Sequence, residues 1–137
     1  MRIIVVDDQP AVRLQVRAAV DAARDLEVVG EATAGSAAIA LVAMVHPDVL
    51  LVDVHTSPET GLGMTRLVRD RFPGVRVVAV GEPGSDLREE AVRAGAWAFV
   101  PNDWEGEDVA HVVRSVARGS RRGLVDLAAA SQRASPR

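Results

Sequence analysis

Cysteine and lysine are both missing from this sequence, and each absence removes a class of chemistry. Without cysteine there can be no disulfide, no thiolate metal site and no cysteine nucleophile. All 16 basic side chains are arginines, so no function that requires a lysine ammonium group is available. Aromatic residues make up only 3% of the chain. The core must therefore be built from valine, alanine, leucine and isoleucine, which favours helices layered on a sheet.

The chain also lacks a long apolar run and an excess of positive charge. No stretch resembles an N-terminal leader or a membrane span, so we expect a cytoplasmic protein without a membrane partner. Its 137 residues fit a single domain. The net charge of -3 provides no basic surface for nucleic acid. We therefore expect contact with DNA only through a domain that is absent from this chain.

What is present is a regular alternation of two hydrophobic patterns. Short apolar runs rich in β-branched residues predict buried strands at residues 3–6, 27–29, 49–52, 75–80 and 98–100. Between them, apolar residues recur at helical spacing in residues 11–23, 36–45, 63–71, 86–94 and 106–118. Strands that are apolar on both faces imply a parallel sheet covered on both sides. With right-handed crossovers, this predicts a doubly wound, flavodoxin-like α/β domain with strand order 2-1-3-4-5.

Proline and glycine positions agree with this division. Pro10 suits the first turn of the first helix, Pro47 separates the second helix from the third strand, and Gly95 lies where the fourth helix should end. After Gly119 the composition shifts to Arg, Ser, Ala and Gly. We expect residues 1–119 to form the domain and residues 120–137 to be a linker or tail, with any DNA-binding domain lying beyond it.

Three aspartates follow the first and third predicted strands. Asp7 and Asp8 come directly after the first strand, and Asp53 ends the third. The winding of the sheet reverses between these strands, and ligands of such sheets bind beyond the carboxyl ends there. We expect the three carboxylates to converge, to raise one another's pKa values and to titrate as a coupled unit. Mg²⁺ suits such a site best, because it accepts a few carboxylates and keeps its other positions for water and a phosphoryl oxygen.

A purely structural explanation competes for two of these residues. Aspartate is a good N-cap residue, and Asp7 and Asp8 stand just ahead of Pro10 at the start of the first predicted helix. That explanation does not extend to Asp53, because no helix begins directly behind it. The set of three therefore favours a binding site.

Four segments, in this order and spacing, are similar to the receiver domains of response regulators: RIIVVDDQPAVR, EVVGEATAGSAAIAL, HPDVLLVDVHTSPETG and AVRAGAWAFVPND. The resemblance spans residues 2–119 and is greatest to receivers that precede a LuxR/NarL-type helix-turn-helix in transcription factors. It implies that Asp53 accepts a phosphoryl group from a histidine kinase. It also implies a Mg²⁺ site formed by Asp7, Asp8, Asp53 and the backbone carbonyl of His55. The resemblance further implies a regulator rather than an enzyme, with a homodimer or another regulatory protein as a partner.

Two positions depart from the pattern of this family. Receivers usually carry Ser or Thr at the end of the fourth strand, where this chain has Gly81, and Lys at the end of the fifth, where it has Asn102. An ammonium about 4 Å from a phosphoryl charge is worth about 4 kcal/mol at an effective dielectric near 20. A charge-assisted hydroxyl hydrogen bond adds roughly 1.5 to 3 kcal/mol. Inverting a two-state equilibrium needs about 5.5 kcal/mol, so losing both groups predicts a degenerate switch.

Other residues around the predicted pocket allow two interpretations each. Phe99 matches the aromatic that reports the switch in relatives, but an aromatic on a buried strand is also ordinary core. The side chain of His55 lies where the family influences loss of the phosphoryl group, or it simply faces solvent. Thr56, Ser57 and Ser85 either supply a substitute hydroxyl or are ordinary polar loop residues.

Two functional hypotheses remain open. In the first, the domain is a phosphoaccepting regulator that controls transcription through an effector domain or partner. In the second, it is an atypical pseudo-receiver, an interaction or ligand-sensing module that works without phosphorylation. Enzymes rank lower: the carboxylates of Asp7 and Asp8 would repel the phosphate of FMN in a flavodoxin, and an aspartate-nucleophile phosphatase normally needs a lysine. One stripe of valines fits either a dimer face or the core: Val109, Val112, Val113 and Val116.

Overall fold

The computed structural model describes residues 1–33, 35–54, 58–82, 84, 86–102 and 106–119, and this part of the chain forms a five-stranded parallel sheet with five helices. The strands are β1 (Arg2–Val6), β2 (Glu27–Ala32), β3 (Val49–Asp53), β4 (Arg76–Gly81) and β5 (Ala98–Pro101). The helices are α1 (Pro10–Asp21), α2 (Gly35–Val45), α3 (Pro58–Arg71), α4 (Leu87–Ala94) and α5 (Gly106–Ala117). The strand order is β2-β1-β3-β4-β5, which confirms the predicted doubly wound fold.

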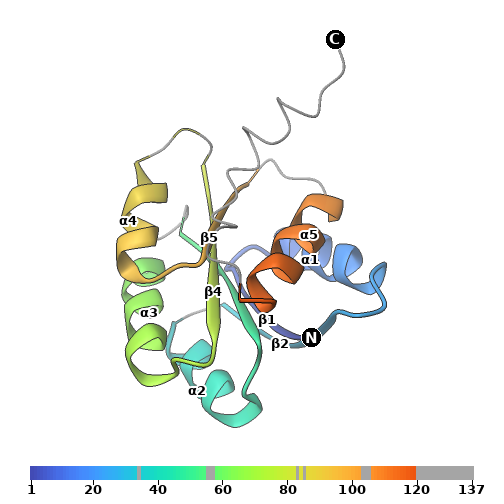
Figure 1. Cartoon of the computed structure of the whole chain (residues 1–137), viewed down its shortest axis with the longest axis horizontal. Coiled ribbons are helices and arrows are strands. Elements are labelled where there is room, and N and C mark those ends of the chain that lie inside the picture. Colours follow the sequence, from blue (N-terminus) through green and yellow to red (C-terminus); the bar gives the residue numbers. More distant parts are fainter. Residues whose placement is uncertain (34, 55–57, 83, 85, 103–105, 120–137) are drawn as a thin grey trace.

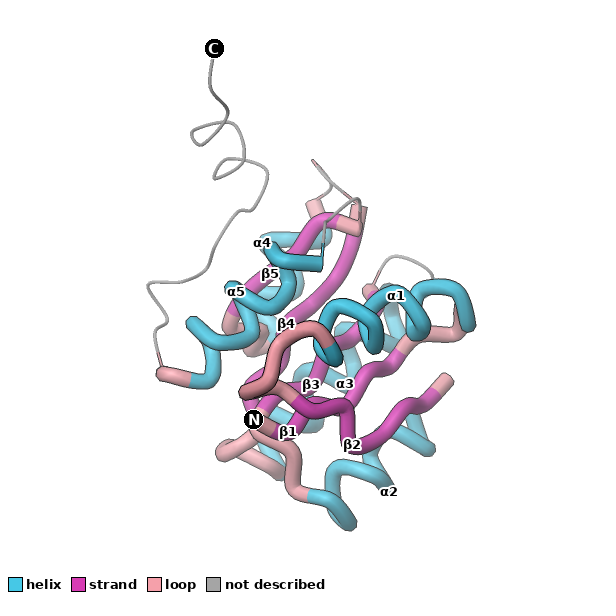
Figure 2. The backbone as a smooth tube through the Cα atoms, turned by 90° about the vertical axis from the view of Figure 1, so that its right-hand side faces the viewer, coloured by secondary structure: helices cyan, strands magenta, loops and turns pink. Residues whose placement is uncertain are grey.

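Helices cover both faces of the sheet, α1 and α5 on one face and α2, α3 and α4 on the other (Figures 1 and 2). Each face has its own apolar core, and alternate residues of each central strand contribute to the two cores. The valine stripe of α5 belongs to the core beneath α1 and α5, because all four valines are at most 1% exposed. Of the two explanations for this stripe, the structure therefore supports core packing.

The predicted boundaries differ most at α3. This helix begins at Pro58, five residues earlier than predicted. The prediction missed its first turn because Gly61 and Gly63 weaken the helical sequence pattern there. Strand β2 continues to Ala32 along its pairing with β1. The other boundaries agree to within two residues. The predicted tail, residues 120–137, lies outside the described residues.

The ends of the helices follow the proline and glycine signals. Pro10 is the first residue of α1, where its missing N–H costs nothing. Gly95 ends α4 with φ 112°, a left-handed conformation that glycine adopts without strain. No helix in the described ranges is long and apolar enough to cross a membrane.

An arginine joins the amino edge of the sheet to the last helix. Arg76, the first residue of β4, donates from Nη1 to the carbonyls of Val116 and Ala117 at 2.8 Å each. Its guanidinium also lies 4.5 Å from the centre of the Trp97 ring. Arg76 therefore caps the end of α5, where the Val116 carbonyl also accepts from the backbone N–H of Gly119 at 3.0 Å.

Candidate acidic site at the carboxyl edge of the sheet

The three aspartates singled out in the sequence lie together at the carboxyl edge of the sheet. Val6 of β1 pairs with Val52 of β3, so the residues after them emerge side by side. Asp7, Asp8 and Asp53 each offer a carboxylate oxygen, and these oxygens all lie within 4.8 Å of one another. Asp7 is buried, Asp53 is half-buried and Asp8 is exposed. The expected convergence of the three carboxylates is thus observed.

Asp7 is held in place by two hydrogen bonds. Its backbone N–H donates to the carbonyl of Ala32 at 3.0 Å, and its Oδ1 accepts from the backbone N–H of Gln9 at 2.8 Å. The N-cap residue of α1 is Gln9, which makes no side-chain capping bond. Neither Asp7 nor Asp8 is therefore the helix cap that the structural explanation required, although Asp7 does fasten the turn that leads into the helix.

The pKa of Asp7 is raised from 3.8 to about 6, and burial is the largest cause. The charges of Asp53 and Asp8 contribute to this rise, whereas the hydrogen bond from Gln9 and the charge of Arg13 oppose it. Mutual repulsion of the three carboxylates, the cause expected from the sequence, is thus smaller at Asp7 than the effect of removal from water. A hard divalent cation coordinated by these oxygens would relieve both effects.

Arg13 was not singled out in the sequence, although it belongs to the surroundings of the site. Its Nη1 donates to the backbone carbonyl of Asp7 at 2.6 Å, and its Nε lies 3.7 Å from the carboxylate of Glu31 on β2. The sequence could have indicated this role, because Arg13 lies near the start of the helix that follows Asp7 and Asp8. Arg13 fixes the backbone beside the acidic cluster from the side of α1.

The two departures from the family pattern lie beside each other across β4 and β5. The backbone N–H of Asn102 donates to the carbonyl of Gly81 at 2.7 Å. A β-carbon added at Gly81 would lie 2.7 and 2.8 Å from two atoms of the Phe99 ring and 3.2 Å from Cγ2 of Val54. The close approach of Phe99 thus leaves no room for a side chain at residue 81.

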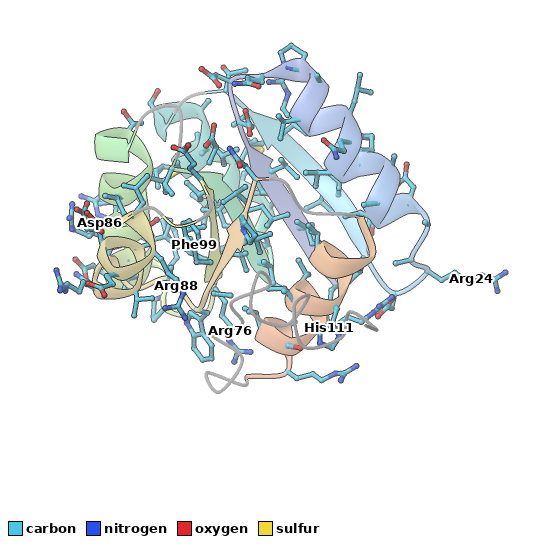
Figure 3. All side chains as sticks on the ribbon, turned by 90° about the horizontal axis from the view of Figure 1, so that it is seen from above. Arg24, Arg76, Asp86, Arg88, Phe99 and His111 are labelled. Carbon is cyan, nitrogen blue, oxygen red and sulfur yellow. The ribbon has the colours of Figure 1, made fainter. Side chains whose placement is uncertain are left out.

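Phe99 itself is 5% exposed and belongs to the core beneath α2, α3 and α4. Figure 3 shows it in the interior of the molecule, whereas Arg24 extends into solvent. The structure therefore agrees with the core interpretation of Phe99, although the ring also borders the position of the missing hydroxyl. The remaining predicted site residues, His55, Thr56, Ser57 and Ser85, lie outside the described residues.

Comparison with known families decides what kind of domain this is. The family model described as the response regulator receiver domain matches residues 3–114. The chain belongs to the response regulator receiver family. It is a receiver of the kind used in two-component systems, and its relatives include transcriptional regulators.

Individual relatives of the receiver agree with this assignment. The transcriptional regulatory protein YxjL of Bacillus subtilis is 33% identical over 122 residues, which is 87% of this chain and 55% of YxjL. The DNA-binding transcriptional activator DevR/DosR of Mycobacterium tuberculosis is 33% identical over 132 residues, 96% of this chain and 60% of the activator. The chain therefore spans little more than half the length of these curated relatives.

A solved structure shares the receiver fold. The signal receiver domain of the response regulator NarL from Mycobacterium tuberculosis superposes with a TM-score of 0.81 at 29% identity, covering 87% of this chain and 97% of that domain.

Proposed function

We propose that this receiver binds Mg²⁺ at Asp7, Asp8 and Asp53 and can accept a phosphoryl group on Asp53, but does not convert that event into the usual conformational switch. The proposal depends on one contrast at the carboxyl edge of the sheet. Three carboxylates meet within 4.8 Å, whereas Gly81 and Asn102 provide neither a hydroxyl nor an ammonium beside them.

The chemistry at Asp53 follows from its position. A carboxylate oxygen of Asp53 would attack the phosphorus of a histidine kinase phosphohistidine, forming an acyl phosphate while the P–N bond breaks and the imidazole leaves. Bound Mg²⁺, held by the three aspartates and the backbone carbonyl of His55, would neutralise charge on the phosphoryl oxygens. Asp7 must be ionised to act as a ligand, so acid conditions oppose this state.

The weakened readout is supported by the packing around residue 81. In this structure the Phe99 ring stands where a serine or threonine side chain would begin. The phosphoryl group would therefore gain no hydroxyl partner from β4 and no ammonium partner from β5. The lost contacts are of the same order as the roughly 5.5 kcal/mol needed to invert a two-state equilibrium. We infer that phosphorylation alone moves the equilibrium only partly.

The output of the domain is inferred from its relatives. We propose that it regulates transcription in the cytoplasm, without enzymatic activity of its own, through an effector domain outside this chain or through a partner protein. DNA contact would belong to that effector domain, as the name of the activator DevR/DosR suggests. A histidine kinase and a second copy of the chain are the other proposed partners.

Intact-mass spectrometry tests the phosphoacceptor directly. The protein is incubated with MgCl₂ and phosphoramidate or acetyl phosphate, and we expect one phosphoryl adduct that the Asp53→Asn variant does not form. In parallel, beryllofluoride with Mg²⁺ should change tryptophan fluorescence little, because the switch contacts are missing. An unmodified wild type with every donor would contradict the phosphoacceptor role, and a large response to beryllofluoride would contradict the weakened switch.

A second function is favoured by the buried position of Phe99, because a ring packed in the core against Gly81 fits a domain that keeps one conformation. In that case the domain works as a pseudo-receiver, which presents a constant surface to a partner or responds to a ligand. Regulation in vivo should then survive Asp53→Asn as long as the variant is folded. Loss of regulation in a folded variant would leave the phosphorylation-dependent function as the correct one.

A further inference from the structure

A groove between α2 and α3 is a feature of the described surface that the receiver function does not use. Its volume is about 450 Å³. We call it the α2–α3 groove, and it is lined by Gly35, Ser36, Ile39, Thr60, Gly63, Met64 and Leu67. None of these residues belongs to the acidic cluster. Helices α2 and α3, which carry these residues, lie on the face of the sheet that also carries α4 (Figure 1).

The groove exists because small residues stand where two helices face each other. A β-carbon added at Gly35 would be in ordinary contact with Cγ2 of Thr60 at 3.5 Å, so the helices touch at that end. A β-carbon added at Gly63 would meet nothing within 4 Å. Open space therefore lies beside Gly63, and a larger side chain at this position would occupy it.

The lining has an uneven chemical character. Met64 is buried, and Ile39 and Leu67 are half-buried, so an apolar wall is already partly removed from water. No lining residue is charged, although 26% of the whole chain is charged, and α2 contains no charged residue at all. Hydroxyl groups occur only at Ser36 and Thr60, near the end where the helices touch. The lining therefore offers no charged side chain to retain an ionic ligand.

We propose that the α2–α3 groove binds a neutral, largely apolar small molecule that carries one hydrogen-bonding group. Its volume falls within the roughly 300 to 1,000 Å³ of small-molecule sites, which are mostly apolar with a few polar groups that set orientation. The apolar body would lie against Ile39, Met64 and Leu67, and the polar group would face Ser36 or Thr60. An extended polypeptide fits less well, because its backbone N–H and C=O groups would find few partners there.

The groove shares helix α3 with the acidic edge of the domain. The first turn of α3 packs tightly behind β3, since a β-carbon at Gly61 would lie 2.8 Å from the carbonyl oxygen of Asp53. A molecule in the groove would contact the same helix at Gly63, two residues after Gly61. The ligand site nevertheless stands independently of the proposed function, because it needs neither Mg²⁺ nor phosphorylation.

Titration with the neutral dye 1-N-phenylnaphthylamine tests the proposal, since this probe has an apolar body and one N–H. We expect saturable one-to-one binding with increased dye fluorescence. The variant Gly63→Phe should bind at least about tenfold more weakly, because the ring enters the open space beside α3. The matched control is Gly74→Phe, made at another glycine with nothing within 4 Å of an added β-carbon, and it should bind like the wild type.

Glycine amide signals in a ¹H–¹⁵N correlation spectrum locate the probe. Gly35 and Gly63 should shift during the titration, whereas Gly74 and Gly119 should not. Asp53→Asn should bind the dye unchanged, so a failure of the phosphoacceptor role leaves this result intact. Unsaturable binding, equal binding by Gly63→Phe and wild type, or shifts confined to other glycines would each overturn the proposal. So would wild-type dimerisation that Gly63→Phe abolishes, because the occupant would then be a second copy.

Discussion

At Asp7, a single carboxyl group makes the stability of the metal-free domain depend on pH in an unusual direction. Its folded-state pKa of about 6 exceeds the ordinary 3.8, so between these values the folded state binds more protons than the unfolded state. The free energy of unfolding therefore falls as pH rises through this window. A difference of about 2 pH units corresponds to roughly 3 kcal/mol lost by neutral pH.

We therefore predict that Asp7→Asn stabilises the protein in the presence of a chelator. The amide oxygen can still accept from Gln9, while the buried charge is gone. The gain should approach about 3 kcal/mol near pH 7 and vanish near pH 4, as measured by urea denaturation across this range. Asp21→Asn, at an exposed position, serves as the control for losing one negative charge. A gain that stayed constant with pH would show that ionisation of Asp7 is not its cause.

Gly81 and Phe99 form a second residue-scale feature, because the ring allows only a hydrogen at residue 81. We predict that Gly81→Ala costs about 1 to 3 kcal/mol through overpacking. The cost should fall sharply in a Phe99→Ala background, which itself loses roughly 3 to 5 kcal/mol. Denaturant unfolding of the four proteins in this double-mutant cycle gives the coupling free energy. Additive effects would contradict the steric explanation, and Gly74→Ala provides a glycine substitution in open space.

Helix α3 offers a comparison at the scale of an element, since it contains two glycines in opposite surroundings. Gly63→Ala should stabilise the protein by about 1 kcal/mol, because the helix gains propensity and the methyl group meets nothing. Gly61→Ala should instead destabilise it by about 1 to 3 kcal/mol, because its β-carbon would approach Val54 and the Asp53 carbonyl to 2.8 Å. Urea denaturation measures both. Changes of the same sign would mean that helix propensity, and not the packing behind β3, governs this segment.

The elements also show how far the sequence could predict this structure. Periodicity identified every strand and helix of the described region, because burial on two faces leaves continuous apolar runs. The strand order then placed Asp53 beside Asp7 and Asp8. The start of α3 was missed because Gly61 and Gly63 hide a helical turn whose stability comes from tertiary contacts.

Other features of the site could not be predicted from spacing. The approach of Phe99 to Gly81 and the bond from Arg13 to the Asp7 carbonyl depend on side-chain directions between neighbouring elements. The α2–α3 groove depends on the distance between two helices, which the sequence does not state. Burial of Asp7, the main cause of its raised pKa, likewise appears only once the sheet and α1 are assembled.

For the whole molecule, a bound ion should act as a stabilising ligand of the folded state. Mg²⁺ at about 100 times its dissociation constant would add about 2.7 kcal/mol to the free energy of unfolding. We predict a rise in melting temperature with MgCl₂ at about pH 7.5 that shrinks at about pH 5, where a proton on Asp7 competes with the ion. Differential scanning calorimetry measures it, with NaCl of equal ionic strength as the control for screening. An equal rise at both pH values would exclude Asp7 as a ligand.

The hydrogen bonds from Arg76 hold the end of α5 at the amino edge of the sheet, away from the acidic cluster. A β-carbon added at Gly119 would lie 3.5 Å from the guanidinium nitrogens of Arg76. Gly119 therefore lies close to the side chain of the first residue of β4. The six residues of β4 extend about 20 Å from there to the acidic edge. Gly119, the last described residue, therefore lies toward the edge of the sheet opposite the acidic cluster. A conformational change that begins at Asp53 would have to be transmitted along the length of β4 to affect the residues near Gly119. A partner that binds at the acidic edge would sense the same change directly.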